Sequence, residues 1–139
     1  MNLGTRLQTA LLDPLVETFI RTSYRILNEA SRPYIRQTRE RLFGLKKIEE
    51  LCPDKEAASS ALAAAKRQLD KVLDNLPDHG GPYFYGQEVT YPDLVVASLF
   101  MGMKTFADEE MWSQAKEWNE GKWKRLLDDF EEREYTKVY

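Results

Sequence analysis

The residues with the strongest chemical character in this chain are a single histidine and a single cysteine. His79 lies between Asp78 and Gly80 in a glycine-rich segment, and Cys52 lies in a short connector before Pro53. A zinc site needs several His or Cys ligands, and a serine triad through His79 would need a nucleophile-elbow pattern that the sequence lacks. We therefore predict no metal site and interpret His79 as an ordinary loop residue.

Acidic residues surround the cysteine and also form the other candidate pairs. Cys52 has Glu49, Glu50 and Asp54 nearby, and negative charges disfavour the thiolate that a nucleophilic cysteine requires. The acidic pairs at 128–129 and 131–132 fall on a predicted surface helix, whereas general acid–base carboxylates need a desolvated cleft. No phosphate loop or dinucleotide-binding glycine pattern occurs. The residue types thus predict no catalytic residue within this chain.

Length and composition indicate a single folded domain. The 139 residues, 42% of them hydrophobic and 12% aromatic, predict one folded domain. A lone cysteine suits a reducing compartment, so we expect the protein in the cytoplasm. No apolar run reaches the roughly 18 residues of a membrane span. The N-terminus lacks the apolar segment and cleavage site of a signal peptide.

Charge is distributed unevenly along the chain. The net charge of −3 argues against general nucleic-acid binding. Residues 1–47 carry nine Lys and Arg against four Asp and Glu. This excess indicates either a solvated helical face, which we favour, or a surface toward an anionic ligand or another domain. A nucleic-acid surface is disfavoured because interleaved exposed aromatic residues beyond Tyr34 are lacking in the basic cluster of Arg32, Arg36, Arg39, Arg41, Lys46 and Lys47.

Helical periodicity dominates the chain, and strand signals are nearly absent. An apolar stripe continues to about Leu27 and is interrupted at Asp13-Pro14. Either Asp13 caps a new helix there or one long helix kinks, and we favour the kinked helix. Further helices are predicted over 34–43, 54–76, 94–106, 108–118 and 123–130, with a structured loop over 78–88.

The helix over 94–106 is apolar nearly all round, which is typical of a buried core helix. With amphipathic neighbours on both sides, it predicts an all-α helical bundle with this helix at its centre. A break between the last two helices is placed at Gly121, and the charged tail from Glu131 is expected to fray.

The most specific local pattern is a capping box before that helix. Thr90 can cap the amide three residues later, and Asp93 can accept a hydrogen bond from the Thr90 amide in return. Val89 and Leu94 lie at the positions of a hydrophobic staple. Pro92 costs little because first-turn amides have no helical partner. The pattern predicts a helix that begins just after Thr90.

At the capping box the sequence resembles a known family. Residues 86–97, GQEVTYPDLVVA, are similar to the buried-helix signature of glutathione S-transferase C-terminal domains. Residues 27–31, 34–40 and 43–44 narrow the resemblance to a fungal group that includes the UstS-like proteins and relatives of bacterial β-etherases. Residues 4–8 resemble the opening of the domain's first helix, and Trp118 with Gly121-Lys122-Trp123 resembles its closing pattern. The resemblance implies one such domain over residues 1–139.

The resemblance also implies a thioredoxin-like domain of about 80 residues before the helical one, carrying the glutathione site and the thiol-activating residue. This sequence starts where the helical domain would start, and it shows no βαβ pattern. We therefore transfer no catalytic residue, and we expect glutathione as a cofactor only if a thioredoxin-like domain is supplied. The family function implied is the acceptor-substrate side of a glutathione transferase, inactive alone.

The resemblance places the acceptor-substrate pocket at the later part of the first helix and the end of the core helix. Ordinary core packing or an exposed domain interface are the alternatives for the same positions. A different function also stays open, namely a non-enzymatic interaction, dimerisation or hydrophobic-ligand module. Expected partners are a thioredoxin-like domain, a second copy or an apolar small molecule, with no nucleic acid and no membrane. The candidate substrate-binding residues are Ile20, Ser23, Tyr24, Leu27, Met103 and Phe106.

Overall fold

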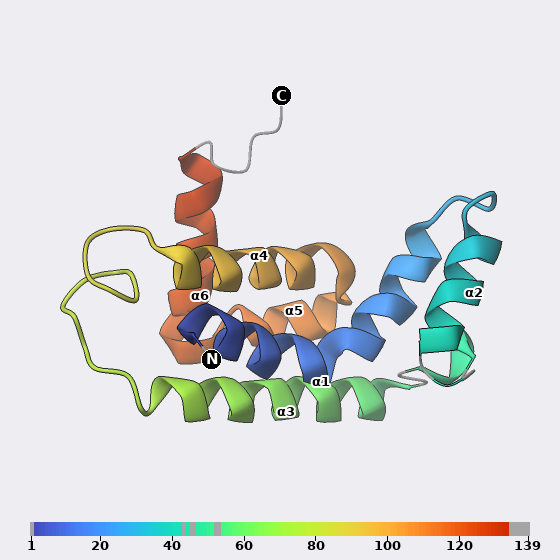
Figure 1. Cartoon of the computed structure of the whole chain (residues 1–139), viewed down its shortest axis with the longest axis horizontal. Helices are drawn as coiled ribbons and strands as arrows, with labels where there is room; N and C mark the ends of the chain where they lie inside the picture. The colour runs from blue at the N-terminus through green and yellow to red at the C-terminus, as the bar shows by residue number, and fades with distance from the viewer. Residues whose placement is uncertain (1, 43, 45–46, 52–53, 134–139) are drawn as a thin grey trace.

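The computed structural model of the chain describes residues 2–42, 44, 47–51 and 54–133 (Figure 1). Over these residues the fold is entirely helical, which confirms the predicted all-α class. The elements are α1 (Leu3–Ile26), α2 (Arg32–Leu42), the short 3-10 helix η1 (Ile48–Glu50), α3 (Lys55–Leu73), α4 (Tyr91–Phe106), α5 (Glu109–Ala115) and α6 (Trp118–Glu132). No helix among the described residues is long and apolar enough to cross a membrane.

The first predicted helix forms as one piece. Asn2 caps α1 by accepting a hydrogen bond from the Thr5 amide at 2.9 Å, and Pro14 lies inside the helix. The choice of one long helix over a capped restart at Asp13 is therefore confirmed. Beyond its first half, α1 turns away from the bundle, and α2 runs beside this outer end (Figure 1). No described side chain of α2 is buried.

The core lies where α1, α3, α4 and α6 pack together. Leu7 and Leu11 of α1, Phe100 of α4 and Trp123 of α6 are each no more than 1% exposed. The helix predicted over 94–106 forms most of α4, and its packing against α1, α5 and α6 confirms the central helix of the predicted bundle. Leu94, near the start of α4, nevertheless remains 44% exposed.

Backbone geometry confirms a break at Gly121. Asn119, Glu120 and Gly121 all have left-handed backbone angles, with φ of 54°, 60° and 77°. Non-glycine residues adopt this conformation only where the surroundings hold them in it. Here the Asn119 side chain accepts a hydrogen bond from the Trp123 indole at 2.9 Å. The turn separates α5 from the apolar stripe of α6, as the sequence predicts.

Two smaller differences concern helix ends. The helix predicted over 54–76 forms α3, which ends at Leu73, and Asp54 caps it by accepting from the Ala57 amide at 2.8 Å. The helix predicted over 34–43 starts earlier, at Arg32, because Pro33 is tolerated in a first turn. The predictions for Cys52 and for the tail beyond residue 133 fall outside the described residues.

Candidate functional site

The start of α4 is organised around a buried carboxylate. Thr90 and Asp93 form a capping box, and Asp93 is 1% exposed. The Asp93 carboxylate accepts hydrogen bonds from the Thr90 amide and the Thr90 hydroxyl, both at 2.9 Å. It also accepts from the Phe84 amide at 3.0 Å. This third bond, which the sequence did not predict, fastens the 78–88 loop to the core helix.

The same loop is tightly built elsewhere. Tyr83 and Gly86 exchange two backbone hydrogen bonds, at 3.1 and 3.2 Å. A Cβ atom on Gly81 would lie 2.0 Å from the Gly86 carbonyl oxygen, so only glycine fits there. Phe84 stacks on Trp123 of α6 with ring centroids 5.8 Å apart. The loop is therefore a fixed structural element against α6.

The six predicted substrate-binding residues lie at the outer end of α1 and the final turn of α4. Both segments lie on the same side of the molecule (Figure 1). Ile20, Ser23, Leu27 and Phe106 are partly buried. Met103 is 1% exposed and belongs to the core, so a substrate reaches it only through neighbouring side chains. Their role in binding stays a prediction.

Tyr24, another of the six, is held by two arginines of α2. Arg36 Nε donates to the Tyr24 hydroxyl at 3.3 Å. The guanidinium groups of Arg36 and Arg32 lie 5.1 and 5.7 Å from the Tyr24 ring centroid, in cation–π contact. Both arginines were expected on a solvated face, so this contact with Tyr24 was not predicted. It arises because α2 folds back beside the outer end of α1.

Arg36 also links α2 to η1. It forms ion pairs with Glu40, at 2.8 Å, and with Glu49. Hydrogen bonding from Arg36 lowers the pKa of Glu49 from 4.5 to about 2, and the Arg36 pKa is raised above its ordinary value, chiefly by the bond to Glu49. Both charged forms are therefore favoured at neutral pH. The arrangement joins α2 and the outer end of α1, here called the arm, to η1.

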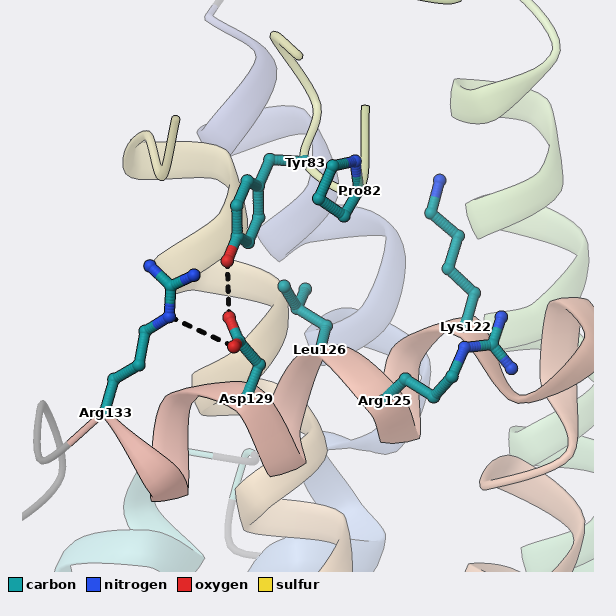
Figure 2. Close-up of a pocket in the computed structure, with 7 residues that line it drawn as sticks. All are labelled: Pro82, Tyr83, Lys122, Arg125, Leu126, Asp129 and Arg133. Carbon is teal, nitrogen blue, oxygen red and sulfur yellow. Dashed lines mark hydrogen bonds and ion pairs between the residues drawn. The ribbon is translucent and has the colours of Figure 1, made fainter. Parts of the chain in front are cut away.

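A pocket of about 460 Å³ lies between the 78–88 loop and α6 (Figure 2). The Tyr83 hydroxyl donates a short hydrogen bond to Asp129, which also accepts from Arg133 Nε at 3.0 Å. This bond to Asp129 raises the pKa of Tyr83. The lining residues are Pro82, Tyr83, Lys122, Arg125, Leu126, Asp129 and Arg133.

Sequence reasoning missed this pocket. It treated the pair at 128–129 as solvation, yet Asp129 binds a tyrosine 46 positions away in the sequence. A second pocket of about 440 Å³ adjoins it, sharing Tyr83 and Lys122, and its lining includes His79. The His79 ring lies 5.4 Å from that of Tyr85. Within the described ranges, no group of three or more His, Cys, Asp or Glu residues is placed to hold a metal ion.

The helical order and the packing of α1, α3, α4 and α6 are those of an all-α helical bundle. The family model described as the C-terminal domain of glutathione S-transferase matches residues 4–135. The chain therefore belongs to the glutathione S-transferase C-terminal domain family. No curated protein matches the sequence.

Solved structures from two fungi share the fold. The chain is similar to the glutathione S-transferases CsGST63524 (24% identity, TM-score 0.82) and CsGST83044 (27%, 0.79) of Ceriporiopsis subvermispora, both solved in complex with glutathione. It is also similar to glutathione transferase GSTFuA3 from Phanerochaete chrysosporium (28%, 0.79). The matches cover 95%, 92% and 98% of this chain but 54%, 53% and 54% of those chains. The chain thus spans about half the length of the structures it matches.

Proposed function

We propose that this domain forms the acceptor-substrate side of a glutathione transferase of the fungal UstS-like and β-etherase-related group. The observation that carries the proposal is the family match over residues 4–135. Likeness to fungal glutathione transferases, two of them solved with glutathione, supports it further. The lone cysteine is consistent with work in the cytoplasm.

The acceptor would bind between the outer end of α1 and the final turn of α4. Ile20, Leu27 and Phe106 are partly buried apolar side chains there. Tyr24 adds an aromatic face and a hydroxyl held by Arg36. Such a surface suits an apolar electrophile with one polar group, since ligand sites combine apolar walls with few fixed polar groups.

We further propose that residues 1–139 do not conjugate glutathione by themselves. Thiol activation needs a donor positioned near the sulfur and groups that stabilise the developing charge. His79 instead packs against Tyr85 in the loop. At the α1 site the Ser23 hydroxyl is occupied, because Ser23 Oγ donates to the Ile20 carbonyl. Glutathione would then be held by a thioredoxin-like domain.

Amide NMR of the labelled chain with 1-chloro-2,4-dinitrobenzene tests the acceptor role. We expect shifts centred on Ile20, Ser23, Tyr24, Leu27 and Phe106, with no conjugation of added glutathione above the uncatalysed rate. Ile20→Ser should weaken these shifts, whereas Ala61→Ser on α3 serves as a matched polar control. Shifts confined to other parts of the molecule, or none at millimolar electrophile, would refute the acceptor role.

A second candidate function is a non-enzymatic interaction module. Ile26, Tyr34 and Leu42 are 66%, 69% and 70% exposed on the arm. Exposed large apolar side chains at one end of a molecule favour a partner or a second copy. Light scattering over a range of concentrations separates the functions. A dimer disrupted by Leu42→Glu, with no electrophile binding, would favour the interaction module, whereas a monomer at all concentrations would count against dimerisation.

A further inference from the structure

We propose that the pocket between the 78–88 loop and α6, here called the α6 pocket, binds a small organic anion with a flat apolar body. An aromatic carboxylate is the ligand class that fits its chemistry. The site lies apart from the proposed acceptor region, because the loop and α6 are at the opposite end of the bundle from the outer end of α1 (Figure 1). Its volume of about 460 Å³ falls in the usual range for small-molecule sites.

The positive charge of the α6 pocket exceeds what its carboxylate neutralises. Asp129 is satisfied by the Tyr83 hydroxyl and by Arg133. Lys122 and Arg125 also line the pocket. Among the described residues, neither of these two has a carboxylate within ion-pairing distance. An entering carboxylate would therefore meet two cations that no described carboxylate pairs with.

Each of these two cations is held by a contact of its own at the edge of the pocket. Arg125 Nη1 donates to the Glu120 carbonyl at 2.6 Å, which ties its side chain to the left-handed turn. Lys122 follows that turn directly, and its ammonium lies 5.0 and 5.9 Å from the ring centroids of Trp123 and Phe84. In Figure 2 both side chains lie to the same side of Leu126, with the Lys122 ammonium pointing away from α6 and the Arg125 guanidinium lying beside the helix. The positive end of the site is thus fixed before any ligand arrives.

The opposite wall is apolar and aromatic. Pro82 and the Tyr83 ring face Leu126 across the pocket (Figure 2). Tyr83 is 7% exposed, and its hydroxyl is already bound to Asp129, so its ring edge is held in place. A flat apolar body can pack against this wall while its carboxylate reaches the cations. A free inorganic anion would leave the wall unused, which is why we favour an aromatic carboxylate.

Titration of the labelled full chain with 2-naphthoate, followed by amide NMR, tests the proposal. We expect saturable shifts at Tyr83 and over residues 122–129, and at least tenfold weaker binding of the neutral analogue 2-naphthalenemethanol. Lys122→Gln with Arg125→Gln should weaken naphthoate binding about tenfold or more, the effect expected for lost bonds to a charged group. Lys124→Gln removes the same charge from α6 outside the pocket, where Lys124 pairs with Asp128 at 2.7 Å, and should leave binding unchanged.

Because Arg125 also ties the left-handed turn, Lys122→Gln alone and the charge-preserving Arg125→Lys complete the series. We expect Lys122→Gln to weaken binding several-fold and Arg125→Lys to keep most of it. Inorganic phosphate binding as tightly as naphthoate would overturn the aromatic part of the proposal. Equal binding of the neutral analogue, an unaffected double variant, shifts centred on α1, or no saturation below millimolar naphthoate would each overturn the site itself.

Discussion

The start of α4 and the arm formed by α2 with the outer end of α1 are both held by charged hydrogen bonds, but in opposite surroundings. Asp93 at the start of α4 is 1% exposed and binds three donors. Where the arm meets η1, the side chains of Arg36 in α2 and Glu49 in η1 are 32% and 52% exposed. The difference shows how burial decides how much a polar contact contributes to the stability of the fold.

The two regions differ because an exposed polar group that loses its partner can bind water, whereas a buried one cannot. A buried donor that loses its partner cannot turn to solvent, so the lost bond costs its full desolvation penalty. When an exposed ion pair breaks, both charged groups bind water instead, so the pair contributes little to the free energy of unfolding. We therefore expect the stability of the domain to depend on Asp93 and its neighbours. The position of the arm should depend on Arg36, whose loss should change the free energy of unfolding of the whole domain only slightly.

The largest effect is expected for Asp93→Ala. The substitution removes the carboxylate of the capping box and leaves the Phe84 and Thr90 amides without a partner, so the free energy of unfolding should fall by about 2–4 kcal/mol. Chemical denaturation followed by circular dichroism measures this change. Asp70→Ala removes an exposed carboxylate that pairs with Lys66 on α3 and should cost less than about 1 kcal/mol. Equal midpoints for the two variants would contradict the role of burial.

Thr90→Ala should have a smaller effect. It removes the hydroxyl donor to Asp93 but leaves the Thr90 and Phe84 amides bonded to the carboxylate. A lost N-cap side chain costs about 1 kcal/mol. The same denaturation experiment gives the value, and an unchanged midpoint in both Thr90→Ala and Asp93→Ala would remove the capping argument altogether.

Arg36→Ala should change global stability by less than about 1 kcal/mol, because its ion pairs are exposed. It should nevertheless release α2 locally, since Arg36 joins Tyr24, Glu40 and Glu49. Amide hydrogen exchange measures this, with faster exchange expected in α2 and unchanged exchange in α4. A uniform change across both helices would show that the arm is part of the cooperative core.

The smallest effect concerns pH. The pKa of Glu49 falls from 4.5 to about 2 on folding, because Arg36 donates to its carboxylate. The contact therefore contributes fully above pH 4.5 and is lost as the pH falls towards 2. The protection of the α2 amides, measured relative to the intrinsic exchange rate at each pH, should fall over this window in the native chain, and Glu49→Gln should abolish the dependence. An identical pH profile in the variant would assign the effect to other carboxylates.

Features set by neighbouring residues could be predicted from the sequence. The pattern around Thr90 and Asp93 is local, and it placed the start of α4 correctly. The kinked α1 followed from a stripe that continues past Pro14. Gly121 correctly predicted the break before the apolar stripe of α6, because glycine is favoured where the backbone is left-handed.

Features that depend on distant residues escaped prediction. Asp93 binds Phe84 in a loop whose path the sequence does not specify. The Tyr83–Asp129 bond joins residues 46 positions apart, and Arg36 meets Glu49 across a helix end. The exposure of Leu94 was also missed, because apolarity says that a surface can be covered but not what covers it. The proposed acceptor residues depend on the resemblance alone.

Calorimetric titration of the 139-residue chain with glutathione separates the proposed acceptor role from glutathione binding. The proposed function gives this domain the acceptor and a separate domain the glutathione. It predicts no saturable heat below millimolar glutathione for the folded chain, with folding verified by circular dichroism. Saturable binding at micromolar glutathione would contradict it, because the domain would then carry a glutathione site of its own.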